Sequence, residues 1–222
     1  MFATSRRGIL MGAIAAGAIA AAACSSQPTT GSSIPAGEPD LPAVRRATER
    51  FMDVKVALAE GYIRDPFDLC DTAEMMGRPA TLGAMGVHYF RPDMVGVTAP
   101  PNPKVNGTGI HTDFLTPSVL IYEPQADGSM QLVAVENLAF AAAWKAAGHA
   151  APPTFHGVSY NYMVDDPATA IDEAHQFEPH YDRHVWIYRE NPNGVFEPFN
   201  PKVSCAHHKG ATLKTTAHGA AH

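Results

Sequence analysis

The sequence predicts an α+β domain: a mainly antiparallel β-sheet of about five or six strands with a long N-terminal helix packed on it. Three patterns predict this class, namely a helical repeat of apolar residues over 41–59, a strand–turn–strand pattern over 119–136 and a period-2 alternation over 180–188. The composition fits a loop-rich globular protein, because 45% of the 222 residues are hydrophobic, 17% are charged, and the chain has 19 prolines and 18 glycines. One domain is expected for this length.

The N-terminal helix is predicted from Leu41 to Ala59. Asp40 can cap its start, Pro42 suits its first turn, and Gly61 follows its end. Apolar side chains recur at intervals of three and four residues and so share one helix face: Val44, Ala47, Phe51, Val54 and Leu58. We expect this face to pack against the sheet.

The next predicted strand covers residues 82–90, after an extended segment that contains Cys70. Glycines weaken a strand and often mark a bulge or the close approach of another backbone or ligand. Gly83 and Gly86 therefore predict that another part of the molecule comes close to this strand, beside His88. The following residues, 91–117, are rich in proline, glycine and asparagine and predict a long loop.

The clearest hairpin is predicted where residues 119–122 and 130–136 flank Asp127-Gly128, a favoured turn pair. Its second strand is expected to end at Glu136, in an otherwise apolar run. An alanine-rich helix over residues 139–147 and a further strand over residues 156–163 are expected to follow.

The densest chemistry lies between Glu178 and Cys205. A strand over residues 180–188 would place His180, Asp182 and His184 on one face, because alternate side chains of a strand point to opposite sides. The run Asn191-Pro192-Asn193-Gly194 then predicts a turn, after which the chain returns toward Cys205 as a core hairpin.

The N-terminus predicts an export signal over residues 1–23. Arg6 and Arg7 form a twin-arginine pair, and the apolar run 9–23 would make about 22 Å of helix, short of a bilayer core of about 30 Å. The small residues before Cys24 resemble the lipobox of bacterial lipoproteins, although Ala21 departs from the usual leucine or valine. This resemblance implies a lipidated Cys24 and an extracytoplasmic protein anchored to a bacterial membrane. The alternative is an ordinary secretory signal with a chance cysteine.

Flanking the domain at residues 41–205, two segments are expected to be flexible. Residues 24–40 have the composition of a tether, and residues 206–222 form a histidine-rich disordered tail. Removal of residues 1–23 takes away two arginines and no acidic residue, so the net charge would change from −6 to −8. This negative charge, with no basic cluster, argues against nucleic acid as a partner and against electrostatic binding to anionic lipid, so the attached lipid would be the membrane contact.

Cys70 and Cys205 are expected to form a disulfide bond if Cys24 carries a lipid, because two cysteines in an exported domain usually pair. Two buried free thiols are the alternative. A metal site built on these cysteines is disfavoured, since neither has a second cysteine close in sequence.

No familiar catalytic motif is present, and a histidine and carboxylate set is the remaining candidate for a divalent metal or ligand site. Its members are His88, Glu136, His180, Asp182 and His184. In a straight strand His180 and His184 lie about 13 Å apart, too far to bind one ion easily, and only a bend at His180 would bring them together. His184 can instead converge with His88 and Glu136 from neighbouring strands. The alternative is that these histidines are buried and hydrogen-bonded, with the carboxylates orienting their rings.

The motifs GYIRDP, LGAMGVHY, LIYEP with LVAVEN, and HYDRHVWIYRENPNGVFEPFNPKVSC look like a group of uncharacterised exported bacterial proteins. This resemblance covers most of residues 60–205 and implies one exported domain, but no activity and no catalytic residue.

Two main hypotheses follow. The first is a non-catalytic envelope lipoprotein that binds a small molecule, a metal or a partner protein. The second is a metal-dependent enzyme with Glu136 or Asp182 as general base. An enzyme needs a water-accessible site, whereas structural histidines should be enclosed and fully hydrogen-bonded. A purely structural role in the envelope would instead expose a large apolar patch.

Overall fold

The computed structural model describes Met1 and residues 34–210. Arg6, Arg7, Cys24 and the rest of the predicted export signal lie outside the described residues, as does the tail from residue 211. None of the described helices has the length and apolar content that crossing a membrane requires. The helices in chain order are α1 Leu41–Thr48, η1 Glu49–Met52, α2 Val54–Ala59, η2 Glu74–Met76, η3 Ala80–Leu82, α3 Pro92–Val95 and α4 Ala141–Ala146.

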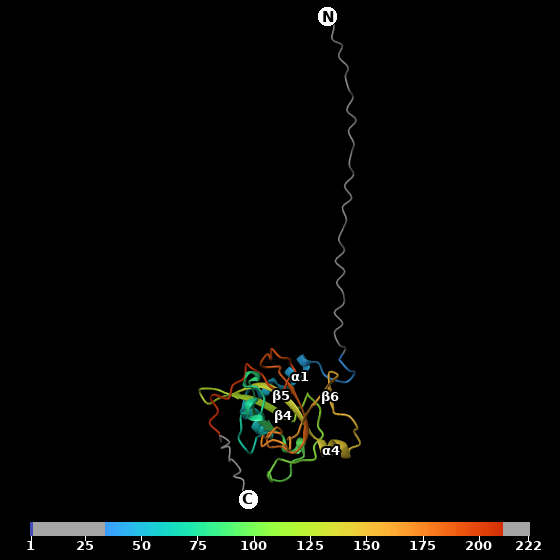
Figure 1. The fold of residues 1–222 in the computed structure, drawn as a ribbon, viewed down its shortest axis with the longest axis vertical. Coiled ribbons are helices and arrows are strands. Elements are labelled where there is room, and N and C mark those ends of the chain that lie inside the picture. The colour runs from blue at the N-terminus through green and yellow to red at the C-terminus, as the bar shows by residue number, and fades with distance from the viewer. Residues whose placement is uncertain (2–33, 211–222) are drawn as a thin grey trace. The chain divides into compact units, whose positions relative to one another are not determined.

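The strands form a seven-stranded sheet and a separate two-stranded hairpin, β6–β7. The strands in chain order are β1 Ile63–Arg64, β2 Asp71–Thr72, β3 Ala84–Phe90, β4 Val119–Pro124, β5 Met130–Phe140, β6 Thr154–Phe155, β7 Val158–Ser159, β8 Asn161–Met163 and β9 His180–Val185. The large sheet has the order β1-β3-β4-β5-β9-β8, with β2 also paired to β3, and its pairs are antiparallel. The predicted α+β class with a mainly antiparallel sheet is confirmed (Figure 1).

The single long helix predicted over residues 41–59 is wrong. The chain becomes extended at Asp53, where φ is −91° and ψ is 108°, and the Asp53 side chain accepts a hydrogen bond from Lys55 N to cap α2. An aspartate side chain competes in this way with helical backbone hydrogen bonds. Val44, Phe51 and Ala57 nevertheless lie in one core cluster, while Leu58 is 50% exposed.

The central hairpin is confirmed as β4 and β5. Gly128 adopts φ 87°, and the Asp127 side chain accepts a hydrogen bond from Ser129 N in the turn. The expected end of the second strand at Glu136 is wrong, because β5 continues to Phe140 and pairs there with β9. Glu136 therefore lies within a buried strand.

The strand predicted over residues 156–163 is interrupted. His156 and Gly157 have φ values of 50° and 74°, which suit a turn and not a strand. They connect β6 to β7, and β8 then joins the edge of the large sheet beside β9.

Close approach to the strand around His88 is confirmed. A side chain on Gly83 would collide with the backbone of Asn200, and one on Gly86 would meet the carbonyl oxygen of Tyr122. The backbone of Ala84 also exchanges hydrogen bonds with Asn200. The C-terminal segment thus packs directly on β3.

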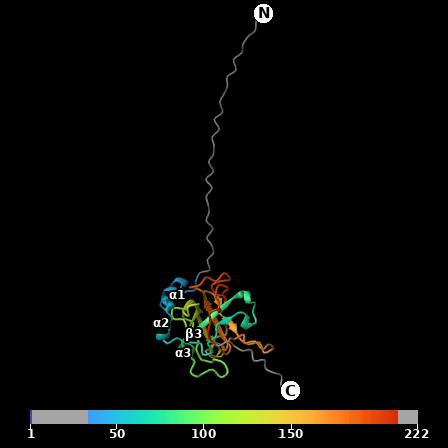
Figure 2. The same cartoon turned by 90° about the vertical axis from the view of Figure 1, so that its left-hand side faces the viewer.

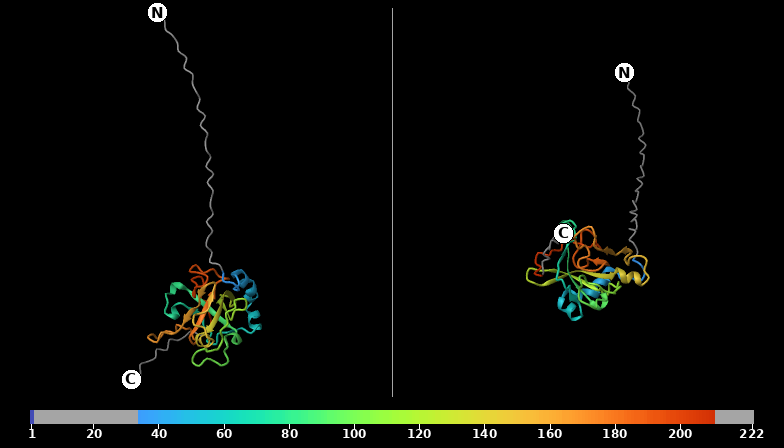
Figure 3. Two further views of the ribbon diagram at one scale, coloured as in Figure 1. Left: turned by 90° about the vertical axis from the view of Figure 1, so that its right-hand side faces the viewer. Right: turned by 60° about the horizontal axis from the view of Figure 1, so that its bottom comes forward.

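The sheet has two contrasting faces. The helix face, covered by α1 and α2, buries one apolar cluster that includes Val44, Phe51, Tyr122, Leu120 and Val185. The histidine face, which carries His88, Glu136, His180, Asp182 and His184, borders a second apolar cluster that includes Phe90, Phe140 and Trp186. Figures 2 and 3 show α1 and α2 on one side of the sheet, with the orange segment after β8 reaching toward the other.

The predicted disulfide bond is present between Cys70 and Cys205, whose Cα atoms are 5.7 Å apart. It ties the start of β2 to the C-terminal segment. A disulfide is compatible with an extracytoplasmic location, where thiols oxidise.

The described ends of the two flanking segments touch the domain. Glu38 accepts a hydrogen bond from His156 N, and Pro39 O contacts His156 Nε2 at 2.8 Å. Residues 206–207 form a turn, and directly after it His208 Nε2 lies 3.5 Å from Asp68 Oδ1.

Candidate functional site

Strand β9 places His180, Asp182 and His184 side by side on one face, as the alternation predicts. All three side chains are 0% exposed. The register with β5 puts Glu136 directly opposite His184 and Leu138 opposite Asp182. Glu136 is itself fully buried, so the middle of the sheet holds a carboxylate against an imidazole.

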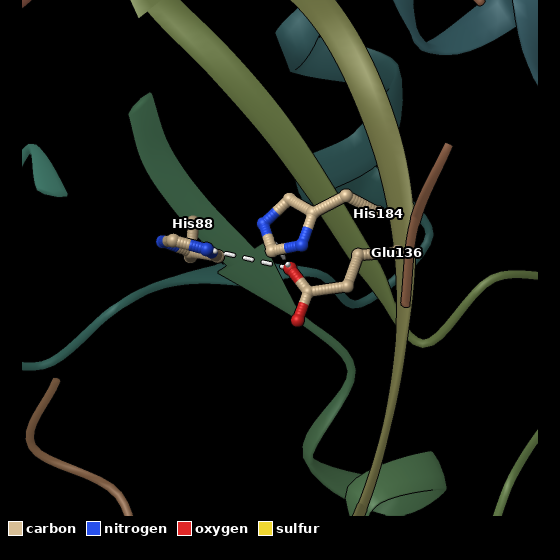
Figure 4. A group of neighbouring side chains, drawn as sticks. All are labelled: His88, Glu136 and His184. Atoms are coloured by element: carbon tan, nitrogen blue, oxygen red, sulfur yellow. Dashed lines mark ion pairs between the residues drawn. The ribbon is translucent and has the colours of Figure 1, made fainter. Parts of the chain in front are cut away.

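His88 reaches the same cluster from β3, two strands away from β5. Its Nε2 lies 3.3 Å from Glu136 Oε2, and His184 Nε2 lies 3.6 Å from the same oxygen (Figure 4). The other nitrogen of His88, Nδ1, lies 2.9 Å from Asp71 Oδ2. A carboxylate in this position fixes the orientation of the imidazole ring and directs its second nitrogen toward the cluster.

A second group adjoins the first. His175, from the segment before β9, brings Nε2 within 4.0 Å of Asp182 Oδ2, and the same oxygen lies 3.9 Å from His184 Nδ1. His180 Nδ1 donates to Glu178 O at 2.9 Å, so its proton is on Nδ1 and Nε2 keeps a free lone pair. The residues thus form two triads, His88–Glu136–His184 and His175–His180–Asp182, each offering ligand atoms within 4.8 Å of one another.

Partnerless polar atoms are concentrated in this cluster. Among the described residues, 18 buried side-chain nitrogen or oxygen atoms lack a hydrogen bond, and 11 of them belong to the two triads and Asp71. They include both nitrogens of His175 and His184 and both oxygens of Glu136 and Asp182. Buried polar atoms normally find partners, so this concentration points to a polar or charged ligand between these side chains.

The histidines differ in charge. Burial lowers the pKa of His180 and of His184 to about 4, and the pKa of His175 lies well below its ordinary value because burial and neighbouring imidazoles disfavour a charge. Burial opposes a charge on His88 as well, but Asp71 and Glu136 outweigh it and hold the pKa of His88 well above its ordinary value. Three of the four imidazoles are therefore neutral at pH 7, the form that binds metal, and an ion bound at His88 would displace its proton.

The two carboxylates of the triads also differ. Burial raises the pKa of Glu136, but His184 and His88 lower it more, so Glu136 is ionised at neutral pH. Burial and the nearby Glu136 charge raise the pKa of Asp182 well above its ordinary value. The cluster thus holds one carboxylate stabilised as an anion and another held against ionisation.

Each triad contains two imidazoles and one carboxylate. This set is used by zinc in hydrolytic sites and by iron(II) in non-haem oxygenases, whereas calcium and magnesium prefer ligand sets made of oxygen. The residues present therefore fit a divalent transition-metal ion. The cluster is enclosed, but it is not fully hydrogen-bonded as a purely structural histidine pair would be.

The structure gathers all five of the sequence-predicted residues on the histidine face, but it divides them. His180 and His184 belong to different triads, as the straight-strand spacing predicted, and His184 does meet His88 and Glu136. Sequence reasoning missed His175 and Asp71. The run of histidines at positions 175, 180 and 184 was a signal for His175, whereas Asp71 has no signal beyond its place after Cys70.

No protein-family model, curated protein or solved structure matches the chain.

Proposed function

We propose that this chain is an exported, lipid-anchored protein of the cell envelope, whose domain binds a divalent transition-metal ion through His88, Glu136 and His184. The observation that carries the metal site is the convergence of buried nitrogen and oxygen atoms from three strands, most of them without a hydrogen bond, with Asp71 orienting His88 from behind. An ion there would supply the partners that these atoms lack and would offset the cost of burying them.

Elemental analysis of the purified protein tests the metal site. We expect near-stoichiometric zinc, iron or manganese that survives gel filtration and is lost in His184→Gln and Glu136→Gln, which preserve side-chain size. His149→Ala is the matched control, because His149 is exposed and lies outside both triads. Absence of bound metal in the unmodified protein after equilibration with each ion would contradict the proposal.

The anchor has a separate test. The disulfide supports an oxidising compartment, and Cys24 supplies the proposed lipid attachment. We expect the unmodified protein in the membrane fraction, Cys24→Ser released from it, and a variant with Arg6 and Arg7 both changed to lysine retained in the cytoplasm. A Cys24→Ser variant that stays with the membrane would contradict lipidation at this residue.

One observation favours the second candidate, a metal-dependent enzyme with Glu136 or Asp182 as general base. A surface cavity of about 640 Å³ includes Asn161 in its wall, and Asn161 pairs in register with Asp182. The complete burial of the triads weighs against it. Water-proton relaxation of the manganese-loaded protein separates the two candidates, because an enzyme needs exchangeable water on the ion, whereas an enclosed binding site gives no relaxation enhancement from coordinated water.

A further inference from the structure

We infer that the domain binds two divalent transition-metal ions side by side, the second held by His175, His180 and Asp182. This inference rests on the proposed function, because it adds an ion next to the first. The second triad has the same chemistry as the first, with two imidazoles and one carboxylate, and its three side chains are at most 5% exposed.

One ion cannot use both triads. Metal-to-nitrogen bonds are about 2.0–2.1 Å long, so two ligand atoms of one ion lie within about 4.3 Å of each other. His180 and His184 leave the same strand four residues apart, and strand geometry separates their backbones by about 13 Å. The two residues also belong to different groups of converging ligand atoms, so each of these histidines can bind an ion as placed only if its own triad holds one.

The second triad is prepared for a ligand. The backbone carbonyl of Glu178 holds His180 by its Nδ1, which leaves Nε2 facing the cluster without a partner. Both nitrogens of His175 are partnerless, and its ring lies at right angles to that of His180, with the ring centres 5.1 Å apart. His175 is also held in a left-handed conformation, with φ 40°, which aspartate, asparagine and histidine tolerate better than most residues.

Asp182 connects the two triads. Its Oδ2 lies 4.0 Å from His175 Nε2 in one triad and 3.9 Å from His184 Nδ1 in the other, and neither of its oxygens has a hydrogen-bond partner. A carboxylate has two oxygens and can ligate two ions at once. Two-metal sites in proteins place their ions about 3.5–4 Å apart, a spacing that a bridging carboxylate supports.

Metal stoichiometry of the purified full chain tests the second site. We expect two ions per chain, and one in His180→Gln and in His175→Asn, where asparagine suits the left-handed backbone. His149→Ala should keep two. A variant with the four tail histidines changed to alanine should also keep two, and a fall to one there would place the second ion in the tail and overturn the inference. These residues are His207, His208, His218 and His222.

Electron paramagnetic resonance of the unmodified protein loaded with copper(II) tests the adjacency of the two ions without depending on the folding of any variant. Two adjacent ions should give a spin-coupled spectrum, and His180→Gln should convert it to that of an isolated ion. A wild-type chain with one ion, lost in His184→Gln and unchanged in His180→Gln, would overturn the second site and leave the proposed function standing. Two ions without spin coupling would show that the two sites are not adjacent. A protein that binds no metal would contradict both the proposed function and the second site.

Discussion

The two faces of the sheet bury polar groups in opposite ways. On the helix face, the hydroxyl of Tyr122 donates to Phe51 O at 2.7 Å and that of Tyr62 donates to Pro117 O at 2.5 Å. The Tyr160 hydroxyl, Asn137 Nδ2 and one guanidinium nitrogen of Arg183 are exceptions there. On the histidine face, in contrast, most ligand-type atoms of the two triads have no hydrogen bond.

The helix face therefore stabilises the fold, whereas the histidine face is arranged for binding at a cost in stability. A buried polar atom without a partner costs about 1–3 kcal/mol, so the histidine face lowers the stability of the metal-free protein. The apolar cluster and the paired hydroxyls of the helix face offset that cost. Substitutions on the helix face should therefore change stability whether or not metal is bound, and those in the triads should change the metal-dependent part.

The largest expected effect comes from the disulfide, which supports both faces. Replacing Cys70 and Cys205 by serine should lower the free energy of unfolding by about 2–5 kcal/mol, because the bond closes a long loop. It should also weaken metal binding, since Cys70 directly precedes Asp71, which orients His88. Urea unfolding with and without metal measures both. A loss of stability with unchanged metal affinity would show that Asp71 holds its position without the disulfide.

Metal-linked stability is the next largest effect. Free metal at 100 times its dissociation constant should stabilise the protein by about 2.7 kcal/mol, which raises the melting temperature by about 5–10 °C. Asp182→Asn should lose much of this rise yet change the metal-free protein by less than about 1 kcal/mol, because burial and Glu136 already disfavour the ionised form of Asp182. Thermal unfolding with zinc and with a chelator measures the two terms. An unchanged zinc response in Asp182→Asn would remove Asp182 from the metal ligands.

Much of this contrast could be predicted from the sequence, because it depends on strands with clear patterns. The alternation in β9 predicted that His180, Asp182 and His184 share one face. The two glycines near His88 predicted the close approach of another part of the backbone. The spacing of His180 and His184 also predicted that these two histidines would not easily share one ion. Regular periodicity was enough for these conclusions.

The rest depended on contacts that no periodic pattern encodes. Asp71 reaches His88 through the register of the two-residue strand β2, which includes a bulge, and His175 enters the cluster from an irregular segment with a left-handed backbone. The break of the N-terminal helix at Asp53 had the same origin, since the apolar repeat continues across it and a side-chain hydrogen bond decides the outcome. Short elements and local polar contacts were therefore the unpredictable part.

A smaller effect is expected from a helix-face substitution that matches the triad variants. Tyr122→Phe removes the donor to Phe51 O and should cost about 1–3 kcal/mol, because it leaves a buried carbonyl without its partner. The same loss should appear with and without metal, and the metal stoichiometry should stay unchanged. Urea unfolding and elemental analysis of this variant test both statements. A Tyr122→Phe protein that also loses metal would show that the two faces are coupled.

The smallest effect concerns Asp65, which lies beside the histidine face but outside both triads. Its backbone N–H donates to His88 O, and burial, together with the charge of Asp71, raises the pKa of Asp65 to about 6. An unfolded aspartate has a pKa of about 3.9, so the folded state binds more protons between about pH 4 and 6. The stabilisation from this group is fully present below about pH 4 and is lost as the pH rises through 6.

Asp65→Asn should therefore stabilise the metal-free protein by about 1–2 kcal/mol at pH 8, because asparagine resembles the protonated acid and keeps the acceptor for Phe67 N. The advantage should shrink as the pH falls and vanish near pH 4. Urea unfolding at intervals from pH 4 to 8, in the presence of a chelator, measures it, with Tyr122→Phe as a control whose deficit should not vary over this range. A stability advantage of Asp65→Asn that does not change with pH would mean that ionisation of Asp65 does not destabilise the folded protein. The cost of buried charge on the histidine face would then be confined to the two triads and Asp71.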